Sequence, residues 1–177
     1  MTFHSTERPI IKAVIDTTTL FNALVLHLVE SSPESHRKGI LETSALSPYL
    51  ARSTTRRGAF LQLFRSIPTI LTTSHVIAEV NGLLRKGQIK GDRHRAFWTH
   101  GMELLNARAL DERSSLRLLD MFIDRTLKEG VCTIGPVDTA LVELARKEGC
   151  ALLTHDKTLG WRAWEIGVDC RLVYKLI

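Results

Sequence analysis

The chain has 177 residues and a formal net charge of +5 at pH 7, with 44% hydrophobic and 24% charged residues. This length and composition indicate a single domain, spanning residues 1–177, that buries its own core without covalent staples. Three widely spaced cysteines, Cys132, Cys150 and Cys170, argue against a disulfide framework and against a structural zinc site. The basic balance favours polyanionic partners such as nucleic acid, although many basic proteins have no such partner.

The sequence pattern predicts neither a secretion signal nor a membrane span. Residues 1–9 lack the apolar core of a signal peptide. The longest apolar stretch, residues 20–29, is interrupted by Asn22 and His27 and is too short to cross a bilayer. Together with the cysteine pattern, these features predict a cytoplasmic protein that does not associate with membranes.

The first predicted elements are a strand and a helix joined by a polar turn. Residues 13–15 (AVI) are apolar and rich in β-branched residues, which predicts a buried strand that stops at Asp16. After the threonines at 17–19, apolar residues recur from Leu20 at the spacing of one helix face. The order is therefore strand, polar turn, helix.

The next stretch, residues 31–58, is rich in serine, threonine and arginine and contains two prolines. This composition predicts an insertion or extended loop, with at most a short helix near Ile40. A helix is then expected over residues 59–66.

Pro68 precedes a second short apolar run, residues 69–71, which predicts another strand. Ser74 is the expected N-cap of a following helix, whose buried face begins at Val76. Two further helices are expected over residues 92–108 and 113–129.

The C-terminal third repeats the alternation of strands and helices. Residues 131–134 (VCTI) predict a third strand, and Pro136 marks the start of a helix that ends at Gly149. Residues 151–153 predict a fourth strand, and residues 171–173 predict a last one after a short helix. This alternation predicts a three-layer α/β/α fold with a parallel sheet of about four to five strands.

Acidic residues follow four of these strands, where parallel sheets bind their ligands. Asp16 directly follows the first strand, and Asp156 follows the fourth by two residues. Glu79 lies early in the helix after the second strand, and Asp138 lies in the first turn of the helix after the third. Each acid alone could simply cap a helix or complement its dipole. Four acids at one sheet edge would repel one another, and Mg²⁺ or Mn²⁺ is the simplest compensation.

These segments resemble the PIN domain nucleases, and among them the small VapC-like toxins of toxin–antitoxin pairs. The matching segments are residues 14–18 (VIDTT), 73–80 (TSHVIAEV), 137–145 (VDTALVELA) and 152–156 (LLTHD). The resemblance implies that Asp16, Glu79, Asp138 and Asp156 are the catalytic, metal-binding acids. It also implies that the hydroxyls of Thr18 and Thr154 orient the metal ligands or a water molecule. The stretch 31–58 is longer than such toxins usually carry.

The resulting hypothesis is a Mg²⁺- or Mn²⁺-dependent ribonuclease, with the toxin of a toxin–antitoxin pair as its more specific form. RNA, an antitoxin protein and a second copy of the chain are the partners that the resemblance implies. Two alternatives remain open: a catalytically weak PIN-like RNA-binding or regulatory module, and a metal-dependent phosphatase.

Three further residues, Arg56, Arg57 and His155, are candidate substrate contacts. A second group of positively charged residues could contact phosphates as well. The alternative for these residues and for the two arginines is that they only form a solvated surface. The second group comprises Arg85, Lys86, Lys90, Arg93 and Arg95.

Overall fold

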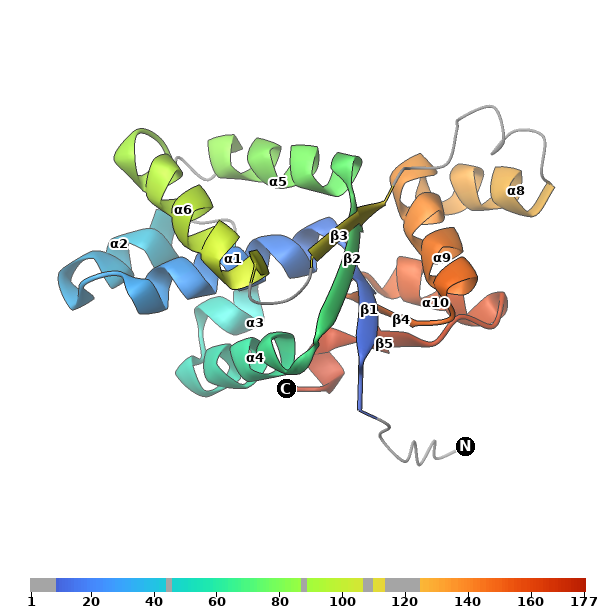
Figure 1. The fold of residues 1–177 in the computed structure, drawn as a ribbon, viewed down its shortest axis with the longest axis horizontal. Coiled ribbons are helices and arrows are strands. Elements are labelled where there is room, and N and C mark those ends of the chain that lie inside the picture. The colour runs from blue at the N-terminus through green and yellow to red at the C-terminus, as the bar shows by residue number, and fades with distance from the viewer. Residues whose placement is uncertain (1–8, 44–45, 87–88, 107–109, 114–124) are drawn as a thin grey trace.

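The computed structural model describes residues 9–43, 46–86, 89–106, 110–113 and 125–177. In these residues the chain forms a three-layer α/β/α sandwich, with a five-stranded parallel sheet between two layers of helices (Figure 1). This confirms the predicted fold class.

The first strand of the chain lies at the centre of the sheet, which has the order β3-β2-β1-β4-β5. Val14 of β1 pairs with Leu71 of β2 and with Leu152 of β4, and all three side chains are fully buried. Apolar strands of this kind form where helices cover both faces of a parallel sheet. The strands are β1 Lys12–Ile15, β2 Thr69–Thr73, β3 Leu110–Arg113, β4 Ala151–Thr154 and β5 Cys170–Leu172.

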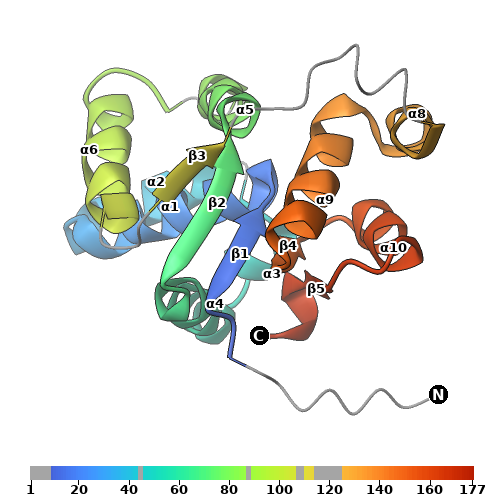
Figure 2. The same cartoon turned by 45° about the vertical axis from the view of Figure 1, so that its right-hand side comes forward.

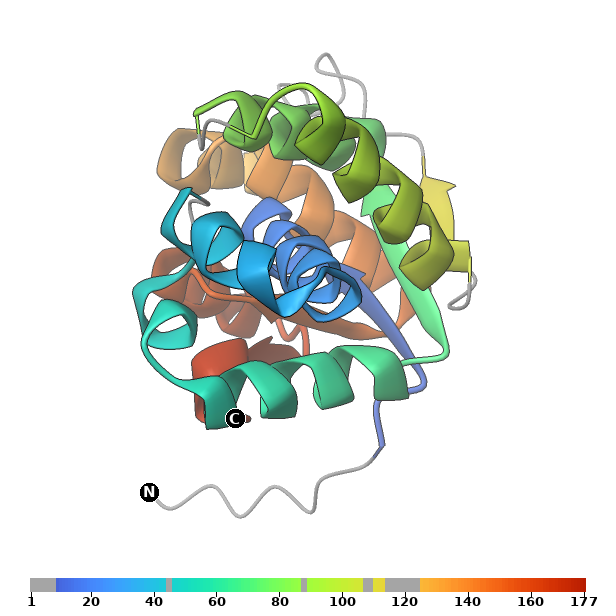
Figure 3. The same ribbon diagram turned by 90° about the vertical axis from the view of Figure 1, so that its left-hand side faces the viewer.

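Helices cover the two faces of the sheet unequally (Figures 1 and 2). One layer, seen from outside in Figure 3, contains α1 Thr17–Ser31, α2 Glu34–Thr43, α3 Pro48–Ala51, α4 Thr54–Ser66, α5 Ser74–Lys86 and α6 Asp92–Asn106. The other contains α8 Arg125–Ile134, α9 Pro136–Glu148 and α10 Lys157–Glu165, and a 3-10 helix, η1 Val173–Lys175, follows β5. Within the described ranges, every helix is too short or too polar to cross a membrane.

Helix α1 lies in the interior, where residues 19–26 are all buried. Phe21 packs against Phe97 of α6, with ring centroids 6.3 Å apart. Gly101 of α6 leaves room for Leu24, whose Cδ2 would lie only 3.2 Å from a Cβ placed on that glycine. Because α1 is packed on all sides, the residue that precedes it, Asp16, is held on a rigid base.

The prediction of a strand over residues 131–134 is wrong, because these residues form the end of α8. Gly130 of α8 lies against Thr139 of α9, and this helix pairing overrides the strand preference of the β-branched residues. The third strand in sequence is instead β3, whose residues 110–113 (LDER) are mostly charged, as suits the edge of a sheet. The helix predicted over residues 113–129 is contradicted at Arg113, and most of it lies outside the described residues.

The prediction of a mainly irregular stretch over residues 31–58 is also wrong, because α2, α3 and the start of α4 occupy it. Pro48 and Ser53 begin helices instead of forming loops. Pro48 occupies the first turn of α3, and Ser53 Oγ accepts a hydrogen bond from the Arg56 backbone N–H at 3.3 Å to cap α4.

Smaller differences occur at other element boundaries. Helix α5 begins at Ser74, so the predicted N-cap is the first helical residue. Thr73 provides the capping oxygen instead, since its Oγ1 accepts from the Val76 backbone N–H at 3.5 Å. Strand β5 begins one residue earlier than predicted, at Cys170. These shifts leave the positions of the strand ends essentially as expected.

Candidate functional site

Asp16 is the most enclosed of the candidate acids, with 5% of its surface exposed. Its Oδ1 accepts from the Thr19 backbone N–H at 2.6 Å, which caps α1. Its Oδ2 accepts from the Thr154 hydroxyl and, at 3.3 Å, from the His155 backbone N–H. The carboxylate therefore ties together the ends of β1 and β4 and the start of α1.

Thr154 connects Asp16 to Asp156. Its side chain is fully buried, and its hydroxyl oxygen also accepts from the Asp156 backbone N–H at 2.9 Å. Asp156 in turn caps α10 by accepting from the backbone N–H groups of Thr158 at 2.6 Å and Leu159 at 3.2 Å. One buried hydroxyl thus fixes the relative position of two acids.

We expect Thr154→Val to lower the free energy of unfolding by about 1–3 kcal/mol. Valine keeps the shape of threonine, but it leaves Asp16 with one donor fewer and the Asp156 N–H without an acceptor. Urea unfolding measures the difference. Thr72→Val is the matched control, since Thr72 of β2 is fully buried and its hydroxyl has no partner among the described residues. Equal destabilisation by both variants would contradict the role of Thr154.

Glu79 lies in the second turn of α5 and is exposed. Its Oε2 accepts from the Thr17 hydroxyl at 2.5 Å, which connects α5 to the first turn of α1. Thr18, the predicted orienting residue, lines the same pocket as Glu79, which is described below. The contact with Glu79 through Thr17 was missed by the sequence analysis, because three consecutive threonines do not show which hydroxyl faces the neighbouring helix.

Asp138 reaches the site from α9, whose first turn begins at Pro136, directly after Gly135. Gly135 has a φ of 89°, a left-handed conformation that glycine adopts without strain and that turns the chain from α8 into α9. The predicted position in the first turn of a helix is therefore confirmed, but that helix follows another helix, α8.

The pKa of Asp138 shows that the other three acids lie near it. Burial, and then the negative charges of Asp16, Asp156 and Glu79, raise the pKa of Asp138 to about 7. Asp16, Asp156 and Glu79 are therefore close enough to Asp138 to disfavour its ionisation. Among the described residues, however, no three His, Cys, Asp or Glu side chains form a ready-made metal-binding group.

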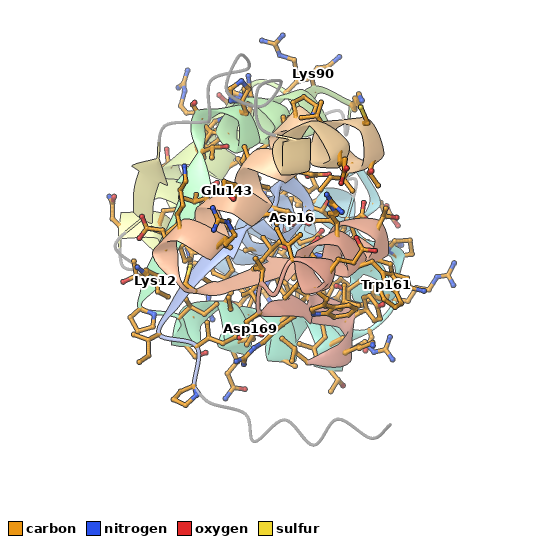
Figure 4. The ribbon with its side chains drawn as sticks, turned by 90° about the vertical axis from the view of Figure 1, so that its right-hand side faces the viewer. Lys12, Asp16, Lys90, Glu143, Trp161 and Asp169 are labelled. Carbon is orange, nitrogen blue, oxygen red and sulfur yellow. The ribbon has the colours of Figure 1, made fainter. Side chains whose placement is uncertain are left out.

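The four acids line a single pocket of about 580 Å³. Its walls come from the start of α1, from α5, from the α8–α9 junction and from the start of α10. Figure 4 views the side of the molecule formed by the second helix layer and labels Asp16, with Trp161 of α10 at the outer edge. The lining residues are Asp16, Thr17, Thr18, Glu79, Gly82, Leu83, Lys86, Ile134, Gly135, Pro136, Val137, Asp138, Asp156 and Leu159.

The His155 ring points behind the site and does not line this pocket. Its Nδ1 lies 3.0 Å from Thr19 Oγ1, and its Nε2 lies 3.4 Å from Asn22 Nδ2. Its ring packs near Tyr49 and Phe60, with centroid distances of 5.5 and 5.9 Å, and burial lowers its pKa. This geometry fits a supporting residue behind Asp16 better than the predicted contact with substrate.

Arg56 and Arg57, the other predicted substrate contacts, lie in the first turn of α4 and are absent from the pocket lining. The Arg57 guanidinium donates to Thr54 Oγ1 at 2.8 Å. Contact of these arginines with a substrate therefore requires a polymer that extends beyond the pocket.

Comparison with known proteins identifies the family. No curated protein matches this sequence significantly. A solved structure, a domain of a functionally unknown protein from Methanocaldococcus jannaschii DSM 2661, is 15% identical, with a TM-score of 0.46 over 90% of this chain and 89% of that chain. The PIN domain model matches residues 40–162, well over half of the chain, and this range includes Glu79, Asp138 and Asp156 but not Asp16. The chain therefore belongs to the PIN domain family.

Proposed function

We propose that this protein is a Mg²⁺- or Mn²⁺-dependent ribonuclease that hydrolyses RNA phosphodiester bonds. PIN domains are generally nucleases, so a hydrolase with a nuclease-type fold is the starting point. The observation that carries the proposal is that Asp16, Glu79, Asp138 and Asp156 line one pocket, where burial and then the charges of the other three acids raise the pKa of Asp138 to about 7.

The donor set fits a hard divalent cation. All four side chains offer carboxylate oxygens, the ligands that Mg²⁺ and Mn²⁺ prefer. Burial and then the neighbouring negative charges raise the pKa of Asp138, and a cation would offset both effects. Asp16 and Asp138 are the proposed direct ligands, and Glu79 and Asp156 would bind directly or through water. When bound, such an ion would activate water and neutralise charge on the phosphate.

The chain's own hydrogen bonds would keep these acids in position. The Thr19 and His155 backbone N–H groups and the Thr154 hydroxyl hold Asp16. The Thr17 hydroxyl holds Glu79. Contacts of this kind orient metal ligands and commonly contribute about 10- to 100-fold to affinity or activity. Thr18, which lines the pocket, is the proposed orienting group for a water molecule or a ligand.

RNA as the substrate rests on the family resemblance and on the net charge of +5, which favours a polyanion. The more specific form of the proposal is the toxin of a toxin–antitoxin pair, with an antitoxin protein and a second copy of the chain as partners. An antitoxin gene beside this one would support that form.

A second candidate function is an RNA-binding or regulatory module with little catalytic activity. It is favoured by the lack, in the described ranges, of a preformed group of three metal-binding side chains. The two candidates differ in a single measurable property, which is cleavage.

We expect the purified protein to cut a single-stranded RNA of generic sequence when Mg²⁺ or Mn²⁺ is present and to lose this activity in EDTA. Denaturing gel electrophoresis of end-labelled RNA measures the products. A small phosphomonoester should remain intact, which separates the nuclease from a phosphatase. RNA that is bound but stays uncut with either metal would refute the nuclease and favour the regulatory module.

A further inference from the structure

One face of α5 runs along the pocket. It contributes Glu79, Gly82, Leu83 and Lys86, which are spaced at i, i+3, i+4 and i+7. Glu79 is fixed beside Asp16 through Thr17, and Lys86 lies two helical turns further on, about 10 Å along the axis. This face therefore leads from the four acids to the C-terminal end of α5.

Lys86 is the one positively charged residue among those that line the pocket in the described part of the chain. A nucleic-acid strand that presents one phosphate to the acids must place its neighbouring phosphates close by. An ammonium group within reach of such a phosphate would offset part of the repulsion from the carboxylates.

Gly82 is a second, independent observation. It lies in the middle of α5, where glycine is less favourable than alanine by about 1 kcal/mol. No turn requires it, and a Cβ placed there would meet no atom within 4 Å among the described residues. Packing therefore does not explain why α5 has the less stable glycine at this position. The lack of a side chain at Gly82 keeps the pocket open between Glu79 and Lys86.

We propose that this face of α5 is a track for the RNA backbone, in which Lys86 binds a phosphate next to the scissile one and Gly82 provides the room for the strand. This inference rests on the proposed ribonuclease function and adds the subsite that holds the neighbouring phosphate.

The alternative is that Lys86 only complements the dipole at the C-terminal end of α5. Arg85 offers a matched control, because it lies in the same turn, is exposed and does not line the pocket. Gly58 offers a matched control for Gly82. It lies in α4, outside the pocket lining, and a Cβ there would also meet nothing within 4 Å.

The test compares Lys86→Gln with Arg85→Gln by steady-state cleavage of single-stranded RNA over a series of salt concentrations. Lys86→Gln should raise KM by about fivefold with kcat kept. It should also reduce the slope of log KM against log salt concentration by about 0.7, the value for one phosphate contact. Arg85→Gln should change neither quantity, and Lys86→Arg should restore the salt slope.

A second comparison tests the track itself. Gly82→Gln should raise KM for RNA by about tenfold or more, because the side chain fills the path of the strand. Gly58→Gln should leave KM unchanged, although both substitutions replace a helical glycine with a better helix former. Thermal melting of both variants shows whether the fold is kept.

A single neutral methylphosphonate linkage, placed at successive positions of the RNA, identifies the contacted phosphate. When the neutral linkage replaces the phosphate that Lys86 contacts, the wild type has already lost this contact. At that position beside the scissile bond, Lys86→Gln should therefore no longer raise KM. If the wild type cleaves RNA while the Lys86 and Arg85 variants behave alike at every position, the subsite is refuted and the nuclease stands. If the wild type neither binds nor cleaves RNA, both proposals fall.

Discussion

Asp16→Asn is expected to reduce metal-dependent RNA cleavage by at least roughly a hundredfold while the protein stays folded. The amide keeps an oxygen that can accept from the Thr19 N–H, and asparagine is as good a helix cap as aspartate. It loses the negative charge that the proposed cation requires, and its NH2 group cannot accept from the Thr154 hydroxyl and the His155 N–H as Oδ2 does. Cleavage of end-labelled RNA in Mg²⁺, together with a thermal melt, measures both effects.

Two further variants separate the loss of charge from the loss of the helix cap and provide a control. Asp16→Ala removes the cap as well as the charge, so it should also lower the free energy of unfolding by about 1–2 kcal/mol. Asp169→Asn is the neutral control, because Asp169 is exposed and pairs with Arg171 outside the pocket lining. An Asp16→Asn variant that cleaves as fast as the wild type would remove Asp16 from the proposed site.

The strands that precede the acids were predictable because they are short, largely apolar and buried. Residues 13–15, 69–71 and 151–153 carry this pattern, and all three segments lie in strands of the sheet. β3 was not predictable, because the segment 110–113 has a charged sequence and becomes a strand only through pairing with β2. Residues 131–134 show the converse, since helix packing against α9 decides their state.

The candidate acids were predictable to a similar degree. Asp16 and Asp156 follow their strands as expected, and Glu79 lies near the start of a helix that follows one. Asp138 was found for a partly wrong reason, since the element before its helix is α8 and not a strand. Position along the chain was enough to select Asp16, Glu79 and Asp156, because the carboxyl ends of parallel strands converge at one edge of the sheet.

The direction in which individual side chains point could not be predicted from the sequence. His155 adjoins Asp156 in the chain, yet its ring lies against Asn22, Tyr49 and Phe60 behind the site. Asn22 is held by Ser47, whose hydroxyl accepts from Asn22 Nδ2 at 2.8 Å. The stretch 31–58 therefore helps to build the wall behind Asp16, a role that only tertiary packing reveals.

Asp138→Asn is expected to stabilise the metal-free protein at neutral pH while it abolishes cleavage. In the folded protein the pKa of Asp138 is raised to about 7, against an ordinary value of 3.8. Between these pH values the folded protein keeps a proton that the unfolded chain has released. The stability of the wild type therefore falls as pH rises from about 4 to about 7, and it stays low above that range.

Asparagine is neutral throughout and avoids this loss. The full shift would correspond to about 4 kcal/mol, and partial exposure of the carboxyl to water reduces the expected gain to about 1–2 kcal/mol at pH 8. At pH 4 the two proteins should be nearly equal. Thermal melts in EDTA at both pH values, with Asp169→Asn as the control, measure the difference.

Addition of metal should reverse the order. Mg²⁺ or Mn²⁺ that binds the folded protein stabilises it in proportion to its affinity, so the Tm of the wild type should rise with metal concentration at pH 8. The Tm of Asp138→Asn should rise much less, because one proposed ligand has lost its charge. This pattern is typical of active sites, where function is kept at the expense of stability. If Asp138→Asn proved less stable than the wild type in EDTA at pH 8, or if metal raised both Tm values equally, Asp138 would be a structural residue and not a metal ligand.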